Sequence, residues 1–227
     1  MKNNSYIDTD IVEVCPNSIE PINIQVSDDD KMRIREKYNL PIDKTIFIYG
    51  GNLGKPQGID FLIDCIRTNE HNKNSYFIIV GSGTEFRKLE SFFEREKPKN
   101  AILLNQLPKS DYEFLANSSD VGLIFLDGRF TIPNFPSRIL SYMQASIPVL
   151  AATDKNTDIG EIIENGNFGY WCESGDLERF NKFVNILCDR ELRVRLGKNA
   201  RNYLENNYTV KHSYEIIMSH FNKDEKR

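Results

Sequence analysis

The chain has 227 residues and a formal net charge of −4, with 40% hydrophobic and 27% charged residues. This length and composition are those of a globular protein with a full hydrophobic core, and no stretch approaches the ~20 apolar residues of a membrane-spanning helix. The acidic balance argues against a nucleic-acid-binding protein, which carries a basic excess.

The four cysteines and three histidines show no spacing typical of metal ligands, so the sequence predicts no metal site. Cys65 and Cys188 fall in apolar helical patterns, where cysteine acts as a small core residue. No Cys-x-x-Cys pair is present. This cysteine usage favours a reducing, cytoplasmic setting.

The first 30 residues do not share the pattern of the rest of the chain. Residues 11–18 predict a short strand that ends in a turn. Ser27 is followed by three aspartates, and this order predicts an acid-capped helix over residues 27–40.

From residue 45 onward, short apolar segments alternate with helical patterns. Strands that are apolar throughout are buried on both faces, as in a parallel sheet, and strand–helix alternation at this spacing is typical of βαβ units. We therefore expect an α/β fold with a doubly wound, Rossmann-like parallel sheet of about six strands, helices on both faces, and a ligand site at the C-terminal strand ends. The predicted strands are 45–50, 76–81, 101–104, 121–126, 149–151 and 169–172, and the predicted helices are 59–67, 86–96, 111–117, 137–145, 159–164, 176–188 and 190–206.

Four glycines and a lysine follow the first predicted strand, in residues 49–58. Glycine lets the backbone turn sharply and approach a ligand closely, and a lysine places a point charge that suits a phosphate. A plain strand–helix turn also favours glycine, but four glycines with a lysine exceed what such a turn needs. The predicted phosphate-contacting residues of this loop are Gly50, Gly51, Asn52, Leu53, Gly54 and Lys55.

A polar loop with two prolines leads into the helix predicted from residue 137. The first turn of a helix has backbone N–H groups without partners and a positive dipole end, which together favour an anion such as phosphate. A helix capped by Ser137 would explain that serine, but not a polar loop at the expected ligand edge. We expect Pro136, Ser137 and Arg138 at the phosphate, with Arg129 as a further candidate.

Three other segments can each be interpreted either as a ligand contact or as an ordinary structural feature. Gly81 and Gly83 form part of a dinucleotide fingerprint, and a tight turn explains them as well as a ligand contact does. Gln106 and Leu107 belong to a loop that either contacts a base or only connects two elements. Glu161 is a candidate contact, although a first-turn position favoured by the helix dipole explains it slightly better. No set of catalytic residues can be assembled, so the catalytic residues are unknown.

The order of these motifs resembles the C-terminal domain of GT-B glycosyltransferases of the large retaining family 4, the glycosyl transferases group 1. No single motif carries the resemblance, but six occur in the family's order between about Val12 and Tyr208. The Asn-Leu-Gly and Pro-Ser-Arg variants resemble a subgroup that assembles bacterial surface polysaccharides. The matching segments are Val12–Ser18, Gly50–Gly58, Val80–Gly83, Ile139–Ala151, Glu161–Gly169 and Gly175-Asp176.

The resemblance implies one half of a GT-B fold that binds a nucleotide diphosphate-sugar without a cofactor or metal. It implies that the diphosphate lies between the Gly50–Lys55 loop and the helix at Ser137. Two family glutamates are replaced by Pro133 and Ser141, and Asn52 and Gln57 stand where the family has a loop arginine and lysine, which leaves Lys55 and Arg138 as the cations. The residues that the resemblance places at the nucleoside are Gly81, Gly83, Gln106, Leu107 and Ser141.

The implied function is transfer of a sugar, with retention, from a nucleotide diphosphate-sugar (UDP-sugar favoured) to a glycan or lipid-linked acceptor. The implied process is surface polysaccharide biosynthesis, of capsule or lipopolysaccharide, by a hexosyltransferase-type enzyme. We expect residues 1–30 to be an interdomain junction, 31–208 the donor-binding domain, and 209–227 a C-terminal helix with a solvated tail. An N-terminal acceptor domain of similar size is not part of this chain, so we expect donor binding with little transfer by the chain alone. The expected location is cytoplasmic, with peripheral association of the whole enzyme at the inner face of the plasma membrane.

Two other functions compete with this one. A non-catalytic GT-B-like partner subunit that has lost donor binding would explain the missing glutamates, but not the retained glycine-rich loop and Lys55. An NAD-dependent oxidoreductase would need a complete Gly-x-Gly-x-x-Gly after the first strand, and the sequence lacks it.

Overall fold

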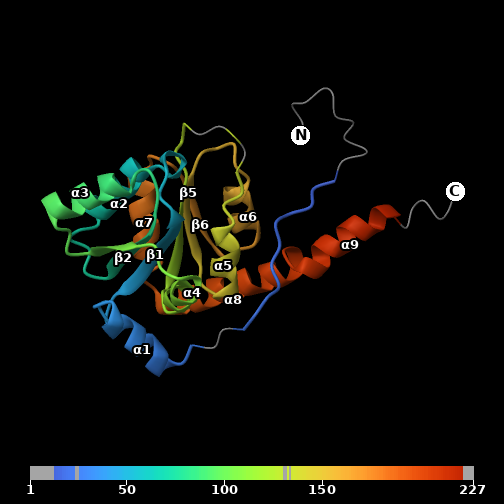
Figure 1. Ribbon diagram of the computed structural model, residues 1–227, viewed down its shortest axis with the longest axis horizontal. Helices are drawn as coiled ribbons and strands as arrows, with labels where there is room; N and C mark the ends of the chain where they lie inside the picture. Colours follow the sequence, from blue (N-terminus) through green and yellow to red (C-terminus); the bar gives the residue numbers. More distant parts are fainter. Residues whose placement is uncertain (1–12, 24–25, 130–131, 133, 222–227) are drawn as a thin grey trace.

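The computed structural model describes residues 13–23, 26–129, 132 and 134–221, and its centre is a six-stranded parallel sheet with the order β3-β2-β1-β4-β5-β6. Helices cover both faces of this sheet (Figure 1). The predicted doubly wound α/β fold is therefore confirmed. The strands are β1 (Thr45–Asn52), β2 (Ser75–Ser82), β3 (Ala101–Asn105), β4 (Val121–Phe125), β5 (Val149–Thr153) and β6 (Gly169–Glu173).

The helices follow the predicted alternation closely, because each apolar face has a sheet face to pack on. One short 3-10 turn, η2 (Lys55–Gln57), comes between β1 and the first covering helix. The α-helices are α1 (Asp28–Lys37), α2 (Ile59–Thr68), α3 (Phe86–Glu96), α4 (Lys109–Asn117), α5 (Arg138–Gln144), α6 (Ile159–Asn165), α7 (Leu177–Ile186), α8 (Arg190–Asn207) and α9 (Val210–Phe221).

Successive residues of β1 point into two separate cores. Phe47 and Tyr49 belong to the core covered by α2, α3 and α7, whereas Ile46 and Ile48 belong to the core covered by α4, α5, α6 and α8. The chain runs outward from β1 to β3 and then returns to β4 beside β1. The strand order therefore reverses between β1 and β4, and ligands of such sheets bind at the C-terminal strand ends near this point.

The N-terminal segment follows the prediction only in its helix. The Ser27 side chain accepts a hydrogen bond from the Asp30 N–H at 3.1 Å, and the Asp30 carboxylate accepts one from the Ser27 N–H, so the predicted acid cap of α1 is confirmed. The predicted strand over 11–18 is wrong for residues 13–18, and residues 11–12 lie outside the described residues. Among the described residues of this segment, Ile19 alone makes a β-bridge, to Thr209, and residues 13–18 have no strand beside them to supply a ladder of partners.

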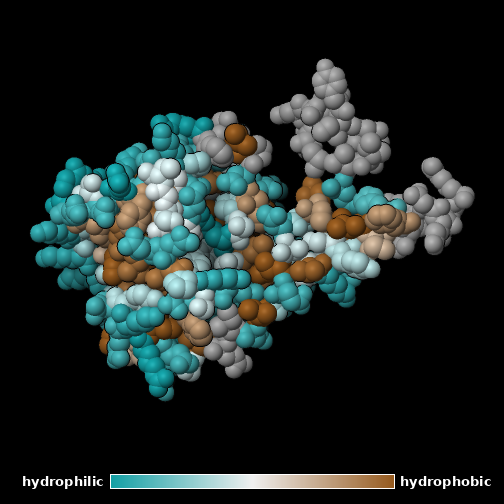
Figure 2. All heavy atoms as spheres, viewed as in Figure 1, coloured by the Kyte–Doolittle hydropathy of each residue, from teal (hydrophilic) through white to brown (hydrophobic). Residues whose placement is uncertain are grey.

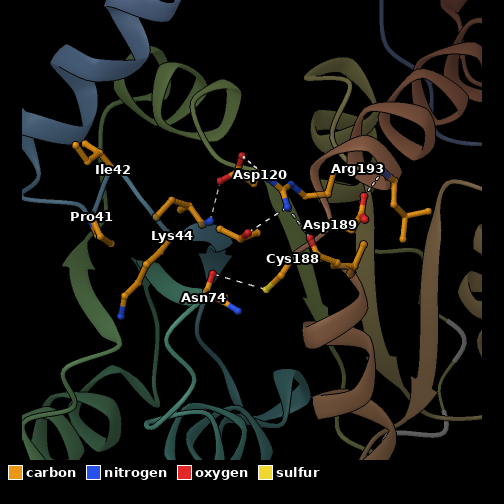
Figure 3. A network of polar contacts seen from close by, with 12 residues as sticks. Pro41, Ile42, Lys44, Asn74, Asp120, Cys188, Asp189 and Arg193 are labelled. Carbon is orange, nitrogen blue, oxygen red and sulfur yellow. Dashed lines mark hydrogen bonds and ion pairs between the residues drawn. The ribbon is translucent and has the colours of Figure 1, made fainter.

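A network of partly buried charges connects α1 and α8 to the N-terminal edge of the sheet (Figure 3). The Asp120 carboxylate accepts hydrogen bonds from the Ile46 N–H at 2.8 Å and from Arg35 Nη2 at 3.0 Å. Arg193 Nη2 lies 3.8 Å from the other oxygen of the same carboxylate. The exposed fractions of the Arg35, Arg193 and Asp120 side chains are 12%, 13% and 24%. One carboxylate therefore joins three segments that are far apart in the sequence.

Helix α9 extends away from the body of the domain (Figure 1), and hydrophobic side chains lie exposed along it (Figure 2). Among the described residues, no helix is long and apolar enough to cross a membrane. The exposed apolar residues of α9 are Val210, Tyr214, Ile217 and Phe221.

Candidate functional site

The C-terminal ends of β1 and β2 meet at a pair of glycines. Gly51 of β1 is in register with Gly81 of β2, and the next pair is Asn52 with Ser82. A Cβ atom on Gly81 would overlap the carbonyl oxygen of Gly51, and one on Gly83 would overlap the carbonyl oxygen of Leu53. Close backbone approach therefore accounts for both glycines, and it brings the two predicted loops together at the expected edge of the sheet.

A pocket of about 440 Å³ opens beside this glycine pair, between the ends of β1 and β2 and the loop that joins β3 to α4. The Ser82 hydroxyl lies 2.9 Å from Gln106 Oε1 and donates to it, which connects two walls of the pocket. The pocket thus gathers several residues that the sequence analysis assigned separately to phosphate and nucleoside. Its lining consists of Gly51, Asn52, Val80, Gly81, Ser82, Gln106, Leu107, Lys109 and Tyr112.

Arg138 places a guanidinium group at the end of β1. The guanidinium carbon lies 4.3 Å from the centroid of the Tyr49 ring, and Nη2 lies 3.6 Å from where a Cβ of Gly51 would be. Nη1 is buried and has no hydrogen-bond partner among the described residues. The ring quadrupole offsets part of the cost of burying this cation, but the N–H donors of Nη1 remain unsatisfied.

Tyr112 completes the wall beside Arg138, and the sequence analysis missed it. Its ring packs where a side chain on Gly50 would be, so Gly50 leaves room for this tyrosine. The Tyr112 hydroxyl is also buried without a hydrogen-bond partner in the described part of the chain. The neighbouring Tyr142 differs, because its hydroxyl donates to the carbonyl oxygens of Ile48 and Leu123, at 3.1 and 3.2 Å.

The start of α5 provides fewer free backbone donors than predicted. Helix α5 begins at Arg138 and has 7 residues, and Ser137 precedes it with helical dihedral angles and no capping hydrogen bond from its side chain. The N–H groups of Ile139 and Leu140 already donate to the carbonyl oxygens of Pro136 and Ser137, at 3.0 and 3.1 Å. The Arg138 side chain is consequently the stronger anion-attracting group at this end of the helix.

The loop before α5 is anchored at two points. The Thr157 hydroxyl donates to the carbonyl oxygen of Asn134 at 3.1 Å. The Phe135 ring lies 5.6 Å from that of Tyr208, measured between centroids. These contacts hold the described end of the loop, whereas Pro133 lies outside the described residues.

Leu53 and Gly54 lie in the predicted phosphate loop, but they have structural contacts there. The Leu53 side chain is fully buried, its N–H donates to Ser82, and its carbonyl oxygen accepts from Glu85. The Gly54 N–H donates to the side-chain oxygen of Gln57 at 3.2 Å. Of the predicted phosphate loop, Gly51 and Asn52 are the residues that line the pocket.

Lys55 and Arg129 line a second, more open pocket of about 450 Å³, together with Asp60, Glu85, Lys88 and Asp127. Arg129 donates two hydrogen bonds to Asp127, at 2.9 and 2.7 Å, and this pairing lowers the pKa of the Asp127 carboxyl. The sequence analysis grouped Lys55 with Arg138 at one diphosphate, but Lys55 lines this second pocket, whereas the Arg138 guanidinium lies buried beside Gly51. The cause is η2, whose 3-10 turn directs Lys55 into solvent.

Ser141 and Glu161 lie apart from both pockets. Ser141 is exposed on α5, and Glu161 is exposed in the first turn of α6. Neither residue lines the pocket at the glycine pair. Within the described ranges, no group of three or more histidine, cysteine, aspartate or glutamate side chains is arranged to hold a metal ion.

Replacing Gly50 with alanine tests the packing of this wall. The new methyl group would overlap the Tyr112 ring, and we expect the free energy of unfolding to fall by about 1–2 kcal/mol, the range of moderate overpacking. Urea unfolding followed by circular dichroism measures the change. Gly128→Ala is the matched control, because its Cβ would meet Ser174 only at ordinary van der Waals distance, 3.5 Å. Equal stability of the two variants would contradict this packing.

The chain is similar in sequence to known glycosyltransferases. The profile of the family described as "Glycosyl transferases group 1" matches residues 30–203. WbjE of Pseudomonas aeruginosa is 27% identical over 167 residues, which are 73% of this chain and 41% of that protein. The capsular polysaccharide biosynthesis glycosyltransferase CapM of Staphylococcus aureus is 27% identical over 208 residues, which are 85% of this chain and 50% of CapM.

The fold is also that of solved glycosyltransferases. The crystal structure of Anabaena HepE, in complex with UDP and glucose, superposes on 87% of this chain and 53% of HepE with a TM-score of 0.70 and 19% sequence identity. The chain spans about half the length of these relatives or less. Since the family profile covers most of it, the chain belongs to the glycosyl transferases group 1 family.

Proposed function

We propose that residues 31–208 are the donor-binding half of a retaining glycosyltransferase, which takes a sugar from a nucleotide diphosphate-sugar. The observation that carries the proposal is the pocket at the glycine pair with the buried, unpartnered Arg138 guanidinium beside it. Residues 1–30 are then the junction to an acceptor-binding domain, and residues 209–227 a C-terminal helix and solvated tail.

The chemistry of this pocket favours a diphosphate next to a nucleoside. Arg138 offers a cation at Gly51, where the absence of a side chain lets a phosphate approach the backbone. The pocket beyond Gly51 is lined by Gln106 and Leu107, and its volume of about 440 Å³ is in the size range of small-molecule sites. In the proposed reaction, Arg138 stabilises the charge that develops on the leaving diphosphate.

The relatives support the finer features of the proposal. HepE was crystallised with UDP and glucose, and with UDP-glucose, which supports a UDP-hexose donor. The name of CapM supports a role in surface polysaccharide biosynthesis. The acceptor that we propose for this role is a glycan or a lipid-linked sugar. We place the reaction in the cytoplasm, with the whole enzyme peripherally at the inner face of the plasma membrane.

The proposal can be tested by calorimetric titration. The chain is titrated with UDP, GDP, UDP-N-acetylglucosamine and NAD, without added metal. We expect one nucleoside diphosphate or its sugar to bind, because the phosphate-facing and nucleoside-facing groups lie in this one chain. Binding of NAD alone would contradict the proposal in favour of an oxidoreductase. Binding of none would favour the non-catalytic partner subunit, which the exchange of a family glutamate for Ser141 also fits.

A further inference from the structure

In the described part of the chain, the Tyr112 hydroxyl is an unpaired polar group close to the Tyr142 side chain. It is buried and lacks a hydrogen-bond partner among the described residues, whereas the hydroxyls of Tyr49 and Tyr142 nearby donate to backbone carbonyl oxygens. A buried hydroxyl without a partner destabilises a protein, and nearly all buried polar groups in native proteins are paired. Phenylalanine would fill the same space without this cost, so the hydroxyl suits a partner from outside the described part of the chain.

The position of Tyr112 shows what such a partner would meet. Tyr112 lines the pocket at the glycine pair, and its hydroxyl end packs against Gly50. The Arg138 guanidinium approaches the next residue, Gly51, and its Nη1 is the other unpartnered buried donor at this end of β1. Two unsatisfied donors, one of them cationic, therefore flank two consecutive glycines that carry no side chains.

The two unsatisfied donors together favour an anionic ligand with several acceptor oxygens. Burial raises the pKa of the Tyr112 phenol, so the hydroxyl keeps its proton at neutral pH and can donate it in a hydrogen bond. A ribose hydroxyl would satisfy Tyr112 but would leave the Arg138 charge uncompensated. A phosphate group presents separate oxygens to both donors, and guanidinium and phosphate form strong charge-assisted hydrogen bonds.

We propose that the Tyr112 hydroxyl binds a diphosphate oxygen of the nucleotide donor, beside the Arg138 guanidinium. The inference rests on the proposed function, and it adds a binding residue from α4 to a diphosphate site that the sequence assigns only to the β1 loop and α5. Tyr112 acts as a neutral donor in this site and Arg138 as the charged one.

Tyr112→Phe in the full chain tests this role, because the substitution removes only the hydroxyl. UDP and GDP are titrated by calorimetry, and uridine and guanosine by ligand-observed NMR, which measures weak affinities. We expect the affinity for the bound diphosphate to fall about tenfold or more, as for a lost hydrogen bond to a charged group, with the affinity for its nucleoside unchanged. Urea unfolding of the variant is expected to show no loss of stability.

Tyr76→Phe is the matched control. Tyr76 is a partly buried tyrosine of β2 whose phenol pKa is also raised by burial, but it pairs with Ile46 at the opposite, N-terminal part of the sheet. Its diphosphate affinity should equal that of the wild type.

Three results would overturn the inference in distinguishable ways. Unchanged diphosphate affinity in Tyr112→Phe would show that the hydroxyl contacts no phosphate, while leaving the proposed function intact. An equal loss for diphosphate and nucleoside would place the hydroxyl at the nucleoside. A wild-type chain that binds neither UDP nor GDP would remove the proposed donor site itself, and Tyr112 with it.

Discussion

The Asp120→Ala variant is expected to lose roughly 3 kcal/mol of unfolding free energy, the low end of the range for removing one partner of a buried ion pair, because these ions are only partly buried. The substitution would leave the Arg35 and Arg193 guanidinium groups, which are 12% and 13% exposed, without their carboxylate. It would also remove the acceptor of the Ile46 N–H at the start of the central strand.

The effect should be largest at α1. This helix has no fully buried residue, and its Ile34 packs on the core only partly buried, so polar contacts contribute strongly to its attachment. Arg35 supplies these contacts by donating to Asp120 and to the carbonyl oxygens of Pro41 and Ile42. We therefore expect faster amide hydrogen exchange in α1 of the variant, because the helix would detach before the sheet unfolds.

Urea unfolding followed by circular dichroism measures the loss of stability, and Asp111→Ala is the matched control. Asp111 also pairs with a cation of α1, Lys37, but both side chains are exposed, and such surface pairs contribute little. Asp120→Asn should fall between Asp120→Ala and the wild type, since it keeps an acceptor for Ile46. If Asp120→Ala and Asp111→Ala unfold at the same urea concentration, the network does not hold the fold.

Most of the fold could be predicted because each strand is a continuous apolar run and each covering helix is amphipathic. The helix predicted over residues 86–96 has those same bounds in the structure, where Leu89 and Phe92 are its buried residues. The predicted strand is absent from residues 13–18 because pairing needs a neighbouring edge, and local sequence does not report one. Val14 is exposed there, although its residue type favours strands.

The site could be predicted only where consecutive residues form it. Gly51 and Asn52 follow a buried strand, so their place at its C-terminal end followed from the fold class. Tyr112 could not be found this way, because its contact with Gly50 depends on how α4 packs on the sheet. Lys55 was grouped with Arg138 from its charge, its place in the glycine-rich loop and the family resemblance, whereas the backbone turn of η2 directs it to another pocket.

Replacing Arg138 with methionine is expected to weaken binding of the nucleoside diphosphate about 30-fold, or ~2 kcal/mol, the value of a hydrogen bond to a charged group. Methionine retains much of the apolar stem that packs near Tyr49 and removes the charge. Arg138→Lys should lose less affinity, because it keeps a cation but not the planar group with two parallel donors.

Unlike its affinity for the nucleoside diphosphate, the stability of Arg138→Met is not expected to fall. The guanidinium is buried with an unsatisfied Nη1 and has no carboxylate partner in the described part of the chain, so its removal relieves a desolvation cost. The lost contact with the Tyr49 ring offsets only part of that gain. We expect the free energy of unfolding of ligand-free Arg138→Met to be no lower than that of the wild type, which would mark Arg138 as a binding residue.

Calorimetry with UDP and GDP, together with urea unfolding of the ligand-free chain, measures both effects. Arg129→Met and Lys55→Met are the matched controls, since each removes a cation from the second pocket, and both should leave diphosphate affinity close to the wild-type value. If Lys55→Met loses the affinity while Arg138→Met keeps it, the diphosphate binds at the second pocket. If Arg138→Met loses stability and affinity together, the guanidinium supports the fold, and its lack of a partner no longer points to a ligand.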